Sequence, residues 1–125
     1  MRFEDQLKSL VARYLAAYNA HDARGCAAVF APDGVILTPF EPIVTGRAAI
    51  QTAHVEWFDE AERDKRFDII EWHSDGLYAY CLLHWSVIVD GPDGMPAQEG
   101  GTSLNILEAR QGEWLITRSA LIPDQ

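Results

Sequence analysis

The chain has 125 residues, of which 48% are hydrophobic, and its formal net charge is −9 at pH 7. A chain of this length fits one domain over residues 1–125, large enough to bury a core without a disulfide or a structural metal. Nucleic acids and anionic membrane surfaces are bound through basic footprints, so this acidic chain is expected to bind neither.

Two helices are predicted at the start of the chain. Apolar residues recur at spacings of three and four over residues 3–18, which is typical of an amphipathic helix. A second, short helix is expected over residues 23–30, with Asp22 as its N-terminal cap. The Pro-Asp-Gly sequence at residues 32–34 is expected to stop it.

A short strand is expected over residues 35–37, followed by a third helix that begins after Thr45, its predicted cap. The apolar stripe of that helix runs from Ile50 to Ala61. The charged run at residues 59–66 is interpreted as the solvated end of this helix.

After residue 66 the hydrophobic period changes from helical to two, which predicts strands over residues 67–73, 77–90, 102–109 and 113–122. Short turns join these strands, so an antiparallel meander is expected. Helices that precede a run of strands indicate an α+β fold with the helices packed on one face of the sheet.

Both faces of the strand at residues 77–90 are apolar. One face can pack on the helices, and the other then needs a cover, which a second copy of the chain would supply most simply. The sequence therefore predicts a homodimer formed through the outer face of the sheet.

The two cysteines, Cys26 and Cys81, lie in different predicted elements among apolar neighbours, which is typical of buried thiols in a reducing compartment. No Cys or His spacing is that of a metal site, so no metal or other cofactor is expected. The first residues do not form a signal peptide, and no apolar run reaches membrane-spanning length. We therefore expect a cytoplasmic protein.

Three segments resemble a known superfamily: Arg-Tyr-Leu-Ala-Ala-Tyr-Asn-Ala-His-Asp at residues 13–22, Val-Phe-Ala-Pro-Asp-Gly-Val at residues 29–35 and Gly-Arg-Ala-Ala-Ile at residues 46–50. They resemble the nuclear transport factor 2-like superfamily, with the ketosteroid isomerases and the SnoaL-like polyketide cyclase group as the most similar members. The resemblance implies a cone-shaped, strongly bent antiparallel sheet wrapped around three N-terminal helices, with an internal pocket. The same scaffold hosts isomerases, cyclases, hydratases, epoxide hydrolases and binding modules.

The resemblance also implies roles for individual residues. Tyr14 matches the tyrosine that donates to the substrate oxygen in ketosteroid isomerase, and Asn105 falls at the second oxyanion donor. Thr38 stands where the isomerase has its general-base Asp, and a threonine hydroxyl is too weakly basic for that role. Ordinary ketosteroid isomerase activity is therefore not expected. His54 falls at a tyrosine that supports the first one, and we expect a hydrogen bond between Tyr14 and His54.

His54 and His84 are the candidates for a displaced base, since an imidazole with a reference pKa of about 6.5 can accept a proton near neutral pH. His54 shares a helix face with Ile50 and Phe58, and His84 shares a strand face with Tyr80. Each histidine has an alternative role as a core residue whose ring nitrogens are satisfied by hydrogen bonds.

The other candidates would form the wall of a pocket for a small apolar ligand, although ordinary core packing is the alternative for each aromatic residue. Arg118 would hold a carboxylate or a phenolate if it points inward, and is a surface charge if it points outward. The expected ligand-binding set is Tyr18, Phe30, Thr38, Phe40, Trp57, Phe58, Trp72, Tyr78, Tyr80, Leu82 and Arg118.

Three functions stay open. The first is an isomerase, cyclase or dehydratase that acts on a small apolar carbonyl compound without the usual Asp base, with His54 or His84 moving the proton. The second is a non-catalytic binding module for a hydrophobic metabolite, and the third is a dimerisation domain. The enzyme should have a histidine nitrogen that faces open pocket volume, whereas a non-catalytic domain should have both imidazoles fully hydrogen-bonded and the cavity filled by side chains.

Overall fold

The computed structural model describes residues 2–60 and 62–125. Its elements in chain order are α1 (Phe3–Asn19), α2 (Ala23–Ala28), β1 (Phe30–Leu37), β2 (Val44–Thr45), α3 (Arg47–Phe58), β3 (Glu62–Ser74), β4 (Tyr78–Asp90), β5 (Pro96–Arg110) and β6 (Glu113–Pro123). This order confirms the predicted α+β class. Within the described residues, no helix is long and apolar enough to cross a membrane.

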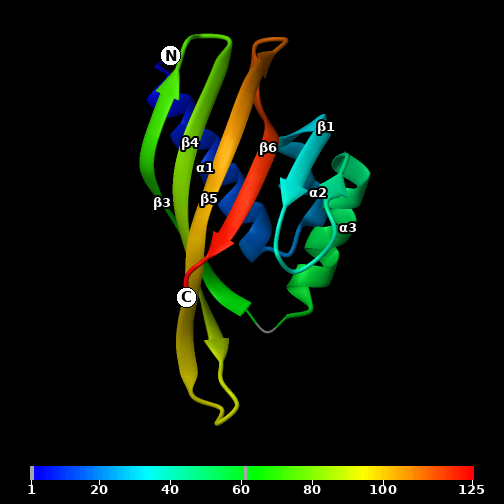
Figure 1. The fold of residues 1–125 in the computed structure, drawn as a ribbon, viewed down its shortest axis with the longest axis vertical. Helices are drawn as coiled ribbons and strands as arrows, with labels where there is room; N and C mark the ends of the chain where they lie inside the picture. Colours follow the sequence, from blue (N-terminus) through cyan, green and yellow to red (C-terminus); the bar gives the residue numbers. More distant parts are fainter. Residues whose placement is uncertain (1, 61) are drawn as a thin grey trace.

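The six strands form one curled, unclosed sheet in the order β2-β1-β6-β5-β4-β3. Strands β3 to β6 form the predicted antiparallel meander. The sheet is not antiparallel throughout, because β1 pairs with β6 in parallel. Figure 1 shows α1 running behind β3, β4 and β5, with α2 and α3 beside the β1 edge and the β4–β5 hairpin extending beyond the rest of the fold.

The core lies between the helices and the inner face of the sheet. Leu7 on α1, Ile50 on α3, Cys81 on β4 and Leu107 on β5 are each at most 1% exposed. Burial of a side chain such as Leu or Ile contributes roughly 1.5–3 kcal/mol. Because the odd-numbered residues of β4 face this core, its even-numbered residues lie on the outer face of the sheet.

Local details around α2 and α3 differ in part from the prediction. Asp22 caps α2 as expected, since its side chain accepts a hydrogen bond of 3.0 Å from the Gly25 backbone amide. Residues 32–34 do not stop α2, which ends before them, and lie instead within β1. Thr45 belongs to β2 and does not cap α3; Gly46, whose φ of 92° favours glycine, is the residue before that helix.

The charged run at residues 59–66 is not a solvated helix end, and that interpretation is wrong: α3 ends before it and β3 begins at Glu62. The register between β3 and β4 shifts around Asp64, whose φ is 55°. Such a bulge adds one residue to a strand. It places Glu62 and Lys65 on the same inner face, although a regular strand would turn side chains three positions apart to opposite faces.

Candidate functional site

A cavity of about 150 Å³ lies between the helices and the inner face of the sheet. A volume of this order holds a ligand about the size of benzene. Trp85 on β4 forms part of the wall, and Gly101 on the neighbouring strand leaves room for it, because a Cβ at Gly101 would lie 2.4 Å from the indole ring. The aromatic residues of the wall are Tyr14, Tyr18, Phe30, Phe40, Trp57, Phe67 and Trp85.

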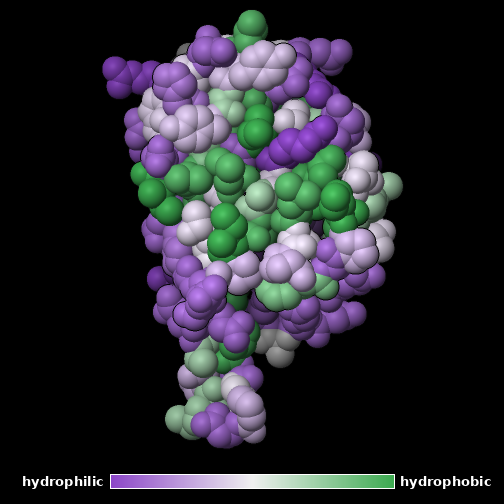
Figure 2. Space-filling view, viewed as in Figure 1, coloured by the Kyte–Doolittle hydropathy of each residue, from purple (hydrophilic) through white to green (hydrophobic). Residues whose placement is uncertain are grey.

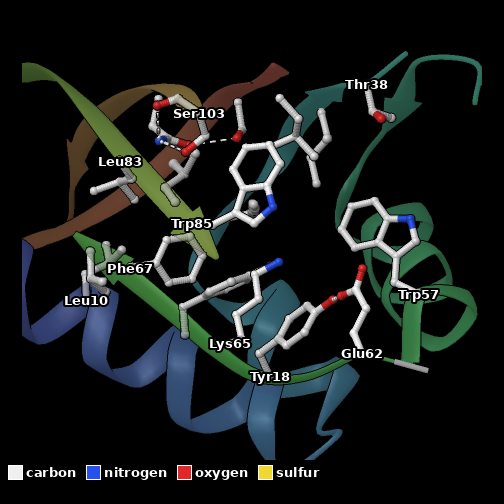
Figure 3. Close-up of a pocket in the computed structure, with 18 of the residues that line it drawn as sticks. Leu10, Tyr18, Thr38, Trp57, Glu62, Lys65, Phe67, Leu83, Trp85 and Ser103 are labelled. Atoms are coloured by element: carbon white, nitrogen blue, oxygen red, sulfur yellow. Dashed lines mark hydrogen bonds between the residues drawn. The ribbon is translucent and has the colours of Figure 1, made fainter. Parts of the chain in front are cut away.

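Lys65 points its Nζ into this cavity from β3 (Figure 3). The Nζ lies 4.2 Å from the centre of the Tyr18 ring and 5.7 Å from the ring centres of Phe67 and Trp85. Across residues 2–60 and 62–125, no carboxylate oxygen lies within 4.0 Å of it. Burial lowers the pKa of Lys65 to about 8, against the opposing effect of Glu62. About a tenth of this amine is therefore unprotonated at pH 7.

Two carboxylates, Glu60 and Glu62, also line the cavity. The Tyr18 hydroxyl donates to Glu62 Oε2 over 2.9 Å (Figure 3). Burial, and then the charge of Glu62, raise the pKa of Tyr18 well above its usual value. Burial and the neighbouring Glu62 also raise the pKa of Glu60. The lining therefore carries more carboxylate than ammonium groups.

Tyr14 and His54 form the expected hydrogen bond, with 2.7 Å between the Tyr14 hydroxyl and His54 Nε2. His54 Nδ1 lies 2.8 Å from the carbonyl oxygen of Ile50. A carbonyl can only accept, so Nδ1 carries the ring proton and Nε2 accepts the proton of Tyr14. The Tyr14 hydroxyl therefore donates its proton to His54. Toward the cavity, the Tyr14 oxygen can act only as a hydrogen-bond acceptor.

His54 itself is 0% exposed and does not line the cavity. Burial lowers its pKa to about 4, and the hydrogen bond to the Ile50 carbonyl opposes this shift. The ring is therefore neutral at pH 7, with both nitrogens hydrogen-bonded. For Tyr14 to donate to a ligand oxygen, as the resemblance implies, His54 would have to be protonated, which its low pKa opposes.

A row of small polar side chains crosses the sheet at the floor of the cavity. The Ser119 hydroxyl donates to Asn105 Oδ1 over 2.7 Å, and Asn105 Nδ2 donates to Ser103 Oγ over 2.9 Å. Asn105 and Ser119 face each other directly in the register of β5 and β6. Figure 3 shows Ser103 at one end of these hydrogen bonds, and its hydroxyl proton has no acceptor in the described part of the chain. The donor available at this place is thus Ser103 and not the predicted Asn105, whose amide donates to Ser103.

The model of the SnoaL-like domain family matches residues 11–115 of the chain. The chain belongs to the SnoaL-like family. No functionally curated protein matches it.

Solved structures share the fold of this SnoaL-like domain. A ketosteroid isomerase-like protein from Erwinia carotovora atroseptica SCRI1043 is 18% identical, with a TM-score of 0.83 over 97% of this chain and 95% of that one. A protein of unknown function from Mycobacterium tuberculosis is 23% identical, with a TM-score of 0.81 over 96% and 70%. An NTF-2-like protein of unknown function from Shewanella oneidensis MR-1 is 13% identical, with a TM-score of 0.80 over 96% and 98%. These likenesses support the cone-shaped fold of the nuclear transport factor 2-like superfamily.

Several of the predicted pocket residues lie on the cavity wall of the SnoaL-like fold. They are Tyr14, Tyr18, Phe30, Thr38, Phe40, Trp57 and Asn105. Trp57 Nε1 donates to Glu41 Oε1 over 3.0 Å, which ties the loop after β1 to α3. The structure thus brings these side chains together, while their roles toward a ligand stay predictions.

The residues predicted from the even-numbered face of β4 are placed wrongly. Tyr78, Tyr80, Leu82 and His84 alternate with the buried residues of β4 and lie on the outer face of the sheet. His84 Nε2 lies 3.0 Å from Asp124 Oδ2, and this histidine cannot serve as a base in the cavity.

Three other predicted ligand contacts lie away from the cavity. Phe58 stacks on His21 with 4.8 Å between ring centres, and Trp72 lies 5.2 Å from the Phe3 ring, so neither forms part of the lining. Arg118 is a surface charge, because it alternates with buried residues of β6 and donates to the Thr117 carbonyl over 2.7 Å.

Several wall residues escaped the sequence-based prediction: Glu60, Glu62, Lys65, Phe67, Ser103 and Ser119. Ser103 could have been found, because it lies two positions before Asn105 on one strand and so shares its face. Lys65 could not, because its inward direction depends on the bulge at Asp64. Among residues 2–60 and 62–125, no group of three or more His, Cys, Asp or Glu side chains is placed to hold a metal ion.

Proposed function

We propose that this SnoaL-like protein binds a small, mostly apolar compound with a carbonyl oxygen in the cavity. The observation that carries the proposal is that Lys65 and Ser103 line one aromatic-walled cavity, and that the Lys65 amine and the Ser103 hydroxyl have no protein acceptors for their protons in the described residues. An apolar ligand with one oxygen acceptor satisfies such a site. Glu60 and Glu62 favour a neutral ligand over an anionic one.

The reaction class proposed for this pocket is isomerisation, cyclisation or dehydration beside the carbonyl, without the usual Asp base. Such reactions begin when a base removes a proton from a carbon next to the carbonyl. Thr38 is too weakly basic, His54 has both nitrogens engaged, and His84 lies outside. The groups that could take the proton are therefore the lining carboxylates Glu60 and Glu62.

A non-catalytic binding module is the second candidate function. The observation that favours it is that both ring nitrogens of His54 are hydrogen-bonded within the protein, as expected of a non-catalytic domain. The cavity itself is open, which favours a ligand under either function.

Binding of cyclohexenone, a neutral enone of about the right size, tests the proposal. We expect saturable quenching of tryptophan fluorescence, and we expect Ser103→Val to raise the Kd about tenfold, because it removes one hydrogen-bond donor and adds bulk to the floor. Thr102→Val, the neighbouring change on the outer face, should leave the Kd unchanged. Equal Kd values for the two variants would contradict the proposal. Loss of α-proton NMR signals in D₂O, accelerated by the protein, would separate the enzyme from the binding module.

We also propose that the protein forms a homodimer through the outer face of the sheet. Figure 2 shows a band of hydrophobic residues across this face. Its exposed apolar side chains include Tyr78, Tyr80, Leu104, Ile106 and Ile122. Contiguous apolar surface of this kind marks interaction sites.

In sedimentation at micromolar concentration, we expect the unmodified chain to be a dimer and Ile106→Glu to be a monomer, because the new charge would be buried unpaired at the interface. Met95→Glu at the tip of the β4–β5 hairpin should stay dimeric. A monomeric unmodified chain would refute the dimer.

A further inference from the structure

We propose that Lys65 forms a covalent imine with a neutral aldehyde or ketone bound in the cavity. This inference rests on the proposed function, because it names the protein group that meets the carbonyl carbon of the ligand. It assigns Lys65 a catalytic role that neither the fold nor the predicted site residues suggest.

The Lys65 side chain points into the cavity and not toward solvent. Lysine side chains normally lay their carbon chain along the protein and keep the ammonium in water. Here the bulge at Asp64 turns the side chain inward, and Nζ lies between the rings of Tyr18, Phe67 and Trp85 at 4.2, 5.7 and 5.7 Å. An amine desolvated among aromatic rings is the environment in which lysine acts as a nucleophile.

The charges around the cavity favour a neutral ligand that forms an imine with Lys65 over an anionic ligand that forms an ion pair with it. A cationic lysine could instead hold a ligand carboxylate. Glu60 and Glu62 line the same cavity, and the whole chain carries a net charge of −9, so an anionic ligand would meet repulsion. A neutral carbonyl meets none. The lowered pKa of Lys65, about 8, supplies the unprotonated amine that attack on the carbonyl needs.

The reaction balances without a further reagent. The lone pair of Nζ attacks the carbonyl carbon, the carbonyl π electrons move to oxygen, and proton transfer from nitrogen to oxygen gives a carbinolamine. A second proton on that oxygen lets the C–O bond break, so that water leaves and the nitrogen lone pair forms the C=N bond of a protonated imine. Loss of the remaining N–H proton to the carboxylate that supplied the second proton gives the neutral imine. Glu60, whose carboxyl pKa is raised by burial, lines the cavity and can pass the second proton. One carbonyl and one amine thus give one imine and one water.

The sequence contains a natural control, because Lys8 and Lys65 are its two lysines. Lys8 lies on α1 with its side chain 61% exposed and 3.4 Å from Glu4. Lys8 thus keeps its amine in solvent, as lysines usually do, whereas Lys65 Nζ lies among aromatic rings. If an aldehyde reacts faster with Lys65 than with Lys8, the difference is therefore due to the cavity and not to the general reactivity of lysine amines.

The test is incubation of the full chain with butanal and sodium cyanoborohydride at pH 7, followed by intact-mass measurement and peptide mapping. We expect Lys65 to gain the reduced butyl group at least about tenfold faster than Lys8, because the cavity holds butanal against Lys65 Nζ and about a tenth of that amine is unprotonated at pH 7. Cyclohexenone at saturating concentration should slow labelling of Lys65 and not of Lys8. Lys65→Arg, which keeps the charge without an imine-forming amine, should abolish the fast adduct, whereas Lys8→Arg should leave it.

Equal labelling of Lys8 and Lys65, or fast labelling that persists in Lys65→Arg, would overturn the imine. Fluorescence titration with cyclohexanol, which has no carbonyl and cannot form an imine, tests ligand binding by the cavity separately from imine formation at Lys65. Saturable cyclohexanol binding without a fast Lys65 adduct would reject the imine and leave the pocket function standing. Absence of both would reject both.

Discussion

Lowering the pH from 7 to 4 should remove about 3 kcal/mol of unfolding free energy through His54 alone. The pKa of this side chain is about 4 in the folded protein, against 6.5 for the ordinary group. Burial therefore favours the neutral ring, and the stability linked to it is fully present above pH 6.5. As the pH falls from 6.5 to 4, the unfolded chain takes up the proton first, and the loss is about 1.4 kcal/mol per pH unit.

Urea unfolding of the unmodified chain and of His54→Gln at pH 7 and pH 4 isolates this effect from the carboxylates. The Gln side-chain oxygen can accept the Tyr14 hydrogen bond and does not titrate, so the variant should lose about 3 kcal/mol less than the unmodified chain over this range. Tyr14→Phe is the matched control. It removes the hydrogen bond at a cost of about 1 kcal/mol but keeps the buried imidazole, so its pH dependence should remain. Parallel curves for the unmodified chain and His54→Gln would contradict the prediction.

The elements of the fold could largely be predicted because their hydrophobic periods are strong. α1, β4 and β6 lie within one residue of their expected bounds, whereas β3 and β5 begin at Glu62 and Pro96, five and six residues earlier than expected. What the period could not decide is which face of β4 points inward, because both faces are apolar. Tyr80 and His84 were therefore assigned to the cavity, although the buried positions Cys81 and Leu83 show that the other face is the inner one.

The polar groups of the cavity were harder to predict, for two physical reasons. The hydrogen bond between Tyr14 and His54 follows from one contact between helices and was expected. Which of the two donates depends on the Ile50 carbonyl, because that backbone oxygen fixes the ring proton on His54 Nδ1. Lys65 sits in a charged run that is typical of solvated surface. Its inward direction comes from the positive φ of Asp64, and alternation along a regular strand does not foresee such a bulge.

Lys65 should cost the folded protein stability at neutral pH, so Lys65→Met should raise the unfolding free energy by about 2 kcal/mol. The pKa of the amine falls from 10.5 to about 8 on folding, chiefly because burial disfavours the ammonium. The folded state therefore loses stability as the pH falls through 10.5 to 8, and the loss is complete at pH 7. The full shift corresponds to about 3.4 kcal/mol, and the partial exposure of the side chain reduces the expected gain to about 2 kcal/mol. Methionine fills a similar volume without a charge.

Urea unfolding at pH 7 and at pH 10.5 checks both the sign and the cause. The gain from Lys65→Met should shrink at pH 10.5, where the lysine is neutral in the folded protein. Lys8→Met removes the exposed pair with Glu4 and should change stability by no more than about 0.5 kcal/mol. A Lys65→Met variant that is less stable than the unmodified chain would mean that the ammonium stabilises the fold. A gain, by contrast, would identify Lys65 as a group that the folded protein holds at a cost, which is the pattern of a residue placed for function rather than for stability.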